Sequence, residues 1–141
     1  MRVEFHGLQF ELSQGWEDIT GDLERRWPPT LAGPLVGGVL QFSVARYKSG
    51  KLPNVTIGDL RRMLLGYCTN LARKFHEPVE KAGRINAVER VSNDGEELLA
   101  VWHLSNGRDV VLATYIGASP RNPQTGNELS QARQLVESIE F

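Results

Sequence analysis

Two tight-turn signals in the middle of the chain constrain its fold most strongly. Ser92-Asn93-Asp94-Gly95 and Ser105-Asn106-Gly107-Arg108 separate three largely apolar segments, residues 85–91, 98–104 and 110–116. Asp-Gly and Asn-Gly pairs favour the two-residue turns that join neighbouring antiparallel strands, because these residues tolerate positive φ angles. The spacing therefore predicts a three-strand antiparallel meander. The last segment is almost continuously apolar, which is typical of a central strand.

Shorter patterns predict strands on the N-terminal side of this meander. Residues 8–12 alternate between apolar and polar side chains, and residues 16–20 follow a Gln-Gly turn as a second short strand, which predicts an N-terminal hairpin. The next strand pattern lies at residues 39–47. Between these strands, residues 21–38 are dominated by proline and glycine, so we expect a long loop there.

Two amphipathic patterns predict helices. Thr56 and Asp59 form a variant of the capping box, and Pro78 predicts the end of the helix that they begin. Its apolar stripe consists of Leu60, Leu64, Tyr67, Cys68, Leu71 and Phe75. The stripe of the second helix, close to the C-terminus, consists of Leu129, Ala132, Leu135, Val136 and Ile139.

The order of these elements predicts an α+β fold. We expect a twisted antiparallel sheet, made of the N-terminal hairpin and the three-strand meander, with two main helices packed on it. The 141 residues, 40% apolar and 23% charged, fit a single domain over residues 1–141. No apolar run approaches the roughly 20 residues of a membrane span, so we expect no membrane partner. The single cysteine and the alternating, leader-free start predict a cytoplasmic protein.

The sequence contains no signature of a catalytic, cofactor or metal site, and we expect a protein that is not an enzyme. The glycine pair at residues 37–38 precedes a strand, whereas glycine loops that bind phosphate begin a helix. His6, His76 and His103 are far apart and lack the spacing of a helical metal site. Cys68 lies in a helix stripe, so we interpret it as a core residue rather than a nucleophile.

The segment from Trp27 to Gly38 is the best sequence candidate for a contact with another protein. Loops of this length without regular structure are usually functional or disordered. Trp27 follows two arginines and precedes two prolines, and two interpretations of it stay open. It is either an apolar interface anchor, together with Leu35, or a side chain that folds back to close the end of the core.

Charge is distributed unevenly along the chain although the net charge is only −1. Acidic residues dominate positions 1–24 and basic residues dominate positions 46–84. The basic segment is either a solvated helix face or a surface that attracts an acidic partner, and binding of nucleic acid is the weaker interpretation. With the loop at residues 48–54, the predicted contact surface contains Arg25, Arg26, Trp27, Leu35, Arg61, Arg62, Arg73 and Lys74.

Three segments resemble the Mog1/PsbP/DcrB-like family of small α+β domains. They are LQFELSQGWEDIT at residues 8–20, DVVLATYIG at residues 109–117 and ELSQARQLVESIEF at residues 128–141. The resemblance implies a non-catalytic protein-binding module, since such proteins act in photosystem assembly, in binding a small GTPase or as effector chaperones. In a bacterial context it implies an immunity protein or an accessory chaperone of a secreted toxin or effector. Apart from the resemblance, the sequence leaves a homodimer open.

A different class of function stays open beside this expectation. A pocket between the sheet and a helix would make the chain a small-ligand-binding protein or a minor enzyme. The polar groups that would converge in such a pocket are those of His103, Tyr67 or Tyr115.

Overall fold

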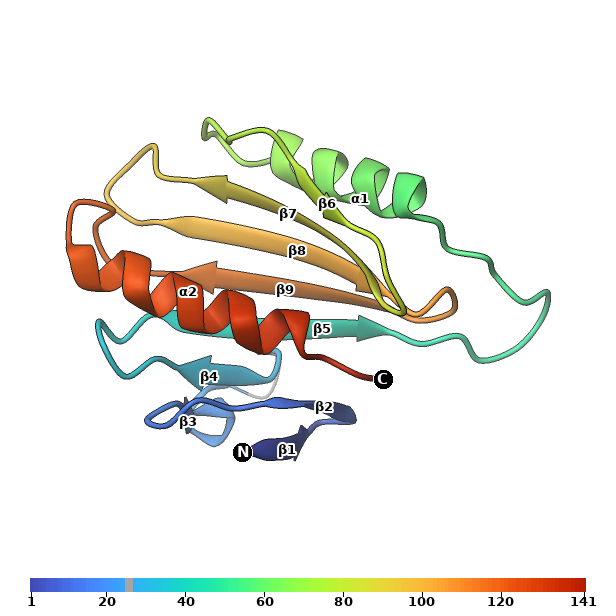
Figure 1. The fold of residues 1–141 in the computed structure, drawn as a ribbon, viewed down its shortest axis with the longest axis horizontal. Coiled ribbons are helices and arrows are strands. Elements are labelled where there is room, and N and C mark those ends of the chain that lie inside the picture. The colour runs from blue at the N-terminus through green and yellow to red at the C-terminus, as the bar shows by residue number, and fades with distance from the viewer. Residues whose placement is uncertain (25–26) are drawn as a thin grey trace.

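A computed structural model describes residues 1–24 and 27–141, and it shows an α+β fold in three layers (Figure 1). The described part of the chain forms a seven-stranded antiparallel sheet of order β3-β4-β5-β9-β8-β7-β6 and a separate two-stranded sheet, β1-β2. The strands are β1 (Arg2–Phe5), β2 (Leu8–Glu11), β3 (Glu17–Asp18), β4 (Thr30–Ala32), β5 (Val39–Ala45), β6 (Val79–Lys81), β7 (Asn86–Ser92), β8 (Leu99–Ser105) and β9 (Val110–Ile116). The α-helices are α1 (Ile57–Thr69) and α2 (Pro123–Glu137), and Thr20–Asp22 form one 3-10 turn.

The predicted meander is confirmed. Strands β7, β8 and β9 follow one another in the sheet as antiparallel neighbours. Gly95 and Gly107 adopt positive φ angles of +144° and +94° in the two connections, but these connections, residues 93–98 and 106–109, are longer than two-residue turns. Strand β8 is buried along its whole length, as expected for a strand with a helix layer on each side.

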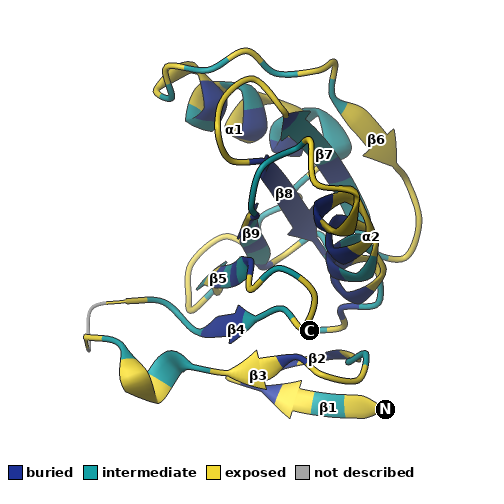
Figure 2. Cartoon of the chain, turned by 90° about the vertical axis from the view of Figure 1, so that its left-hand side faces the viewer, coloured by how far each residue is buried: buried dark blue, intermediate teal, exposed yellow. Residues whose placement is uncertain are grey.

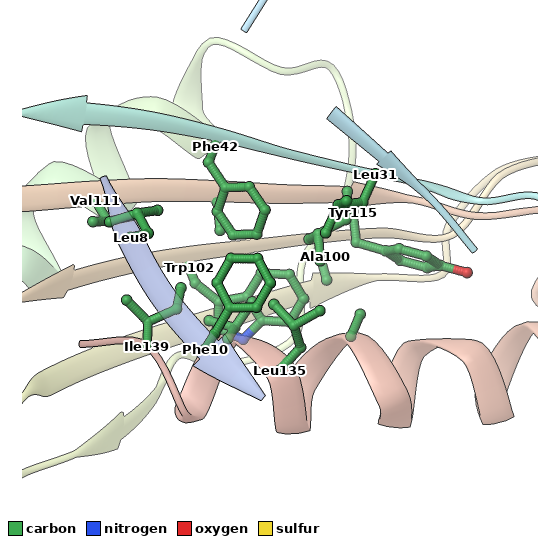
Figure 3. Packing of buried hydrophobic residues seen from close by; sticks show 14 of the residues in the cluster. Leu8, Phe10, Leu31, Phe42, Ala100, Trp102, Val111, Tyr115, Leu135 and Ile139 are labelled. Atoms are coloured by element: carbon green, nitrogen blue, oxygen red, sulfur yellow. The ribbon is translucent and has the colours of Figure 1, made fainter. Parts of the chain in front are cut away.

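Alternate side chains of β8 pack into two different cores. Ala100 and Trp102 belong to the core that also contains residues of α2, β1 and β2. Leu99 and Val101 belong to the core that contains residues of α1. The larger core lies between the sheet, α2 and the small sheet (Figures 2 and 3), and at its centre the rings of Phe10 and Phe42 stack 5.7 Å apart. The predicted core positions of both helix stripes contribute to these two cores.

The N-terminal hairpin is present, but its strands differ from the prediction. Strand β2 pairs with β1 through a two-residue turn at His6 and Gly7, whose φ angles are +52° and +87°. The predicted partner, residues 16–20, contributes only β3, which pairs with β4. A His-Gly pair is a weaker turn signal than Asn-Gly, and the sequence pattern therefore missed β1.

The prediction of a long loop over residues 21–38 is wrong. Strand β4 lies within it and forms a hairpin with β5, closed by a 2.8 Å hydrogen bond from the Gly33 amide to the Gly38 carbonyl. The groups that hold this hairpin come from α2, far away in the sequence, as described below.

Helix α1 begins at the predicted capping box but ends earlier than predicted. Thr56 and Asp59 exchange both capping hydrogen bonds. The helix ends at Thr69, where the side chains of Thr69 and Asn70 donate to the carbonyls four residues earlier. Such bonds compete with continued helix formation. Leu71 and Phe75 still pack against the α1 core, but from a non-helical segment.

Candidate functional site

Helix α1 covers only part of its face of the sheet. Its buried side chains, Leu60, Leu64 and Cys68, pack on β7 and β8, and Figure 2 shows α1 displaced toward that edge. The pairing register places eight side chains of β5 and β9 on the same face, and we call these residues the open face. They are Val39, Gln41, Ser43, Ala45, Val110, Leu112, Thr114 and Ile116. None of these eight is fully buried.

A surface cavity of about 370 Å³ lies where the open face meets the β4–β5 hairpin. Residues 36–39 and Gln41 form its wall on one side and residues 116–118 with Glu97 on the other, while Trp27 lies along its edge. Trp27 is 48% exposed and Ile116 is 40% exposed. The structure therefore excludes the interpretation of Trp27 as a closure of the core and leaves it as an accessible aromatic side chain beside a concave surface.

The backbone of this hairpin is fixed by a buried carboxylate. Glu128 of α2 is completely inaccessible to solvent. Its Oε2 accepts hydrogen bonds from the amides of Leu35 and Val36 at 2.7 and 2.8 Å, and its Oε1 accepts one from the Gly38 amide at 2.7 Å. The hydroxyl of Tyr115 donates to the same Oε1 at 2.9 Å. All four of these groups donate, and together they match the two acceptor oxygens of a carboxylate group.

The glycines of the hairpin are needed for the approach of this carboxylate. A Cβ atom at Gly33 would lie 2.5 Å from Glu128 Oε2, and one at Gly38 would lie 2.6 Å from the Tyr115 hydroxyl. Burial and the neighbouring carboxylate raise the pKa of Tyr115. The glycine-rich segment therefore does bind an anion through its backbone amides, but the anion belongs to the same chain.

Sequence reasoning missed Glu128, although a signal was present. Glu128 lies four residues before Ala132 on the apolar stripe of α2, and an acidic residue on a buried face requires partners. No local sequence pattern indicates that residues 35–38 would supply them.

The contact residues predicted from the sequence do not form one surface in the structure. Trp27 and Leu35 are exposed beside the hairpin, whereas the loop at residues 48–54 lies beyond the other end of β5 (Figure 1). Arg25 and Arg26 lie outside the described residues.

The predicted basic residues are largely engaged within the chain. On α1, Arg61 forms an ion pair of 2.8 Å with Glu80, and Arg62 pairs with Asp59. Arg73 donates to the carbonyls of Ser92 and Glu97 and so holds the β7–β8 turn. The side chain of Lys74 is exposed, while its backbone amide donates to Asp94.

The polar groups of the predicted ligand pocket lie on two different faces of the sheet. Tyr115 faces α2 and is engaged by Glu128. His103 and Tyr67 lie on the α1 side, where their ring centroids are 6.2 Å apart. His103 lines a second cavity at the other end of the open face.

Within residues 1–24 and 27–141, the structure holds no group of three histidine, cysteine or acidic side chains placed to bind a metal. Nor does any helix there combine the length and the apolar character needed to span a membrane. Cys68 is buried, as predicted, and burial raises the pKa of its thiol.

The chain is similar to known proteins in its structure, as two solved structures show. No protein-family model and no curated protein matches the sequence. The solution structure of the cyanobacterial PsbP protein CyanoP from Synechocystis sp. PCC 6803 matches with a TM-score of 0.58 and 11% identity, over 100% of this chain and 91% of that one. A crystal structure of a protein from Bacteroides thetaiotaomicron VPI-5482 matches with a TM-score of 0.55 and 11% identity over 94% of this chain, which spans only 44% of that protein. The chain therefore has a PsbP-like fold, as three of its sequence segments predicted.

Proposed function

We propose that the chain is a non-catalytic protein-binding module whose docking surface is the rim of the cavity beside the β4–β5 hairpin. We define the docking surface as Trp27, Val36, Val39, Gln41 and Ile116. The observation that carries the proposal is the exposure of Trp27 and Ile116 in the lining of one concave surface, part of whose backbone is held by a buried carboxylate.

The chemistry of the docking surface suits a protein partner. A few large side chains, most often Trp, Tyr and Arg, contribute most of the binding energy in protein interfaces, and they act best beside pockets that exclude water. Because Glu128 already holds residues 35–38 in one conformation, binding would lose little backbone entropy there. The exposed Trp27 is then the principal anchor, and Ile116 supplies apolar area next to it.

The partner that we propose is an apolar segment of a secreted toxin or effector, bound in the bacterial cytoplasm. An exposed apolar surface supports a role as an accessory chaperone more than a role as an immunity protein, because a chaperone binds apolar segments before export. The PsbP-like fold is compatible with either role and decides between neither.

Affinity capture from the organism that encodes the chain tests this proposal. The tagged wild-type protein is compared with Trp27→Ala, with Ile116→Ser and with the control Val79→Ser, which changes an apolar side chain that is 61% exposed on β6. We expect one partner protein that is retained by wild type and Val79→Ser and lost by Trp27→Ala and Ile116→Ser. Equal capture by all four proteins would contradict the proposed surface.

Sedimentation of the purified protein completes the test. A monomer at micromolar concentration is the expected result. A dimer that Trp27→Ala dissociates would show instead that the docking surface binds a second copy of the chain.

A further inference from the structure

The second cavity of the open face lies between β5, β9 and the outer side of α1, and its volume is about 370 Å³. Ser43–Ala45, Val110 and Leu112 form its floor and sides, Met63 of α1 lies at its edge and His103 of β8 completes the wall. Among the described residues it has no lining residue in common with the docking cavity. Its volume falls within the range of roughly 300–1,000 Å³ that small-molecule sites occupy.

His103 is a buried polar residue whose Nδ1 has no hydrogen-bond partner among the described residues. Only 6% of the residue is exposed, and no hydrogen bond from the described residues reaches its Nδ1. The pairing register places His103 opposite Leu112, which in turn is opposite Ser43, so the imidazole lies across the cavity floor from β5. A buried polar atom without a partner is costly and rare. Because Nδ1 itself is closed to solvent, a hydroxyl group in the cavity would bind the imidazole at the part of the ring that lines the wall.

The cavity is electrically neutral. Among the described residues that line it, His103 is the only titratable one, and none is an acid, a lysine or an arginine. Two arginines are adjacent in the sequence to residues of the lining, and both have partners elsewhere. Arg46 donates to the Gly7 carbonyl and lies 3.8 Å from the carboxylate of Asp109, and Arg62 pairs with Asp59. Burial lowers the pKa of His103 to about 4, so the imidazole is uncharged at pH 7. An ionic ligand would therefore lose its hydration without gaining a countercharge.

We propose that this cavity binds a small uncharged molecule with an apolar body and one hydroxyl group, which forms a hydrogen bond with the imidazole of His103. A hydroxyl group suits the site because it both donates and accepts, and so matches either tautomer of a neutral imidazole. Val110, Leu112 and Met63 contact the apolar body of the ligand. This binding activity goes beyond the proposed docking of a protein and uses a different part of the open face.

Three probes of similar shape test the assignment by NMR titration of the full chain. They are 4-methylphenol, toluene, which lacks the hydroxyl group, and 4-methylbenzoate, which carries a charge. We expect 4-methylphenol to shift the ring nitrogen resonances of His103 and to bind about fivefold more tightly than toluene, the gain of one neutral hydrogen bond. We expect 4-methylbenzoate to bind more weakly than both.

Variants locate the site. His103→Phe should bring the affinity ratio of 4-methylphenol to toluene close to one, and Ala45→Phe should weaken both probes by filling the cavity. Val79→Ser, on β6, should leave both affinities unchanged. If His103→Phe does not fold, the relative affinities of the wild type for 4-methylphenol and toluene, together with the affinities of Ala45→Phe, still test the proposal. Equal affinities for 4-methylphenol and toluene, a preference for 4-methylbenzoate, no binding of any probe, or shifts confined to residues outside the cavity would overturn the proposal.

Discussion

The hydroxyl of Tyr115 on β9 donates to the buried carboxylate of Glu128 on α2 at 2.9 Å. The same carboxylate receives the amides of Leu35, Val36 and Gly38, so one side chain joins the helix, the central sheet and the β4–β5 hairpin. The surface that we propose for docking therefore takes its shape from a residue that the partner never touches.

Replacement of Glu128 by glutamine should destabilise the protein by about 3 kcal/mol. The amide group of glutamine turns N–H donors toward backbone N–H donors, and at least one buried amide then has no acceptor. The free energy of unfolding in urea measures the effect. Glu137→Gln is the control, because Glu137 forms an exposed ion pair with Lys81, which is worth no more than about 1 kcal/mol. Similar losses in both variants would contradict this role of Glu128.

Truncation of the same residue should create an anion site that can be filled from solution. In Glu128→Ala the three hairpin amides and the Tyr115 hydroxyl surround an empty space, which matches a small carboxylate. We expect sodium formate to raise the melting temperature of Glu128→Ala more than it raises that of the wild type. Sodium chloride at equal ionic strength controls for general salt effects. Identical shifts with both salts would show that the amides do not bind the anion.

Alanine at Gly38 and alanine at Gly126 should have opposite effects on stability. At Gly38 the new methyl group would collide with Tyr115 and Glu128, which should cost about 2 kcal/mol or more. Gly126 lies in α2 with open space around its Cβ position, so alanine should stabilise the helix by up to about 1 kcal/mol. Urea unfolding of both variants provides the comparison. A neutral effect at Gly38 would mean that the hairpin can move away from α2.

The stability of the protein should fall between pH 6.5 and pH 4 because of His103. Burial lowers the pKa of this imidazole from 6.5 to about 4, so in this range the unfolded chain binds a proton that the folded chain does not. The loss should reach about 2 kcal/mol between pH 7 and pH 5, and it should be complete below the folded-state pKa. Hydrogen bonds from Thr20 and Thr56 lower the pKa values of Asp18 and Asp59. The contribution of these two carboxylates to stability is therefore lost only below about pH 4.

Unfolding of wild type and His103→Leu at pH 7 and pH 5 isolates the histidine contribution. The variant should lose about 2 kcal/mol less than the wild type over this interval. The same pH dependence in both proteins would show that His103 titrates normally in the folded chain.

The sequence predicted those elements whose signals are local. Asp94-Gly95 and Asn106-Gly107 fixed the meander, and Thr56 with Asp59 located the start of α1 correctly. The β4–β5 hairpin was not predicted because its amides donate to Glu128, which lies far along the chain. No local pattern indicates a bond between a glycine-rich segment and such a distant helix. The end of α1 was misplaced because the apolar pattern continues through Leu71 and Phe75, whereas the side chains of Thr69 and Asn70 bond to carbonyls of the last turn and end the helix.

The candidate site was predicted only in part. Trp27 was identified from its neighbours in the sequence, and the structure places it beside a cavity. The contribution of Ile116 could not be foreseen, because an apolar residue in a central strand is normally covered. It is exposed here because α1 packs toward β7 and β8 and leaves β5 and β9 uncovered.

Site-specific photocrosslinking in the native organism tests the proposed docking surface most directly. A benzoylphenylalanine replaces Trp27 in one variant and Val79 in another, both on exposed positions of the same chain. We expect irradiation to yield one covalent adduct of defined mass from position 27 and none from position 79. An adduct from position 79 with none from position 27, or no adduct from either, would show that the partner does not dock beside Trp27.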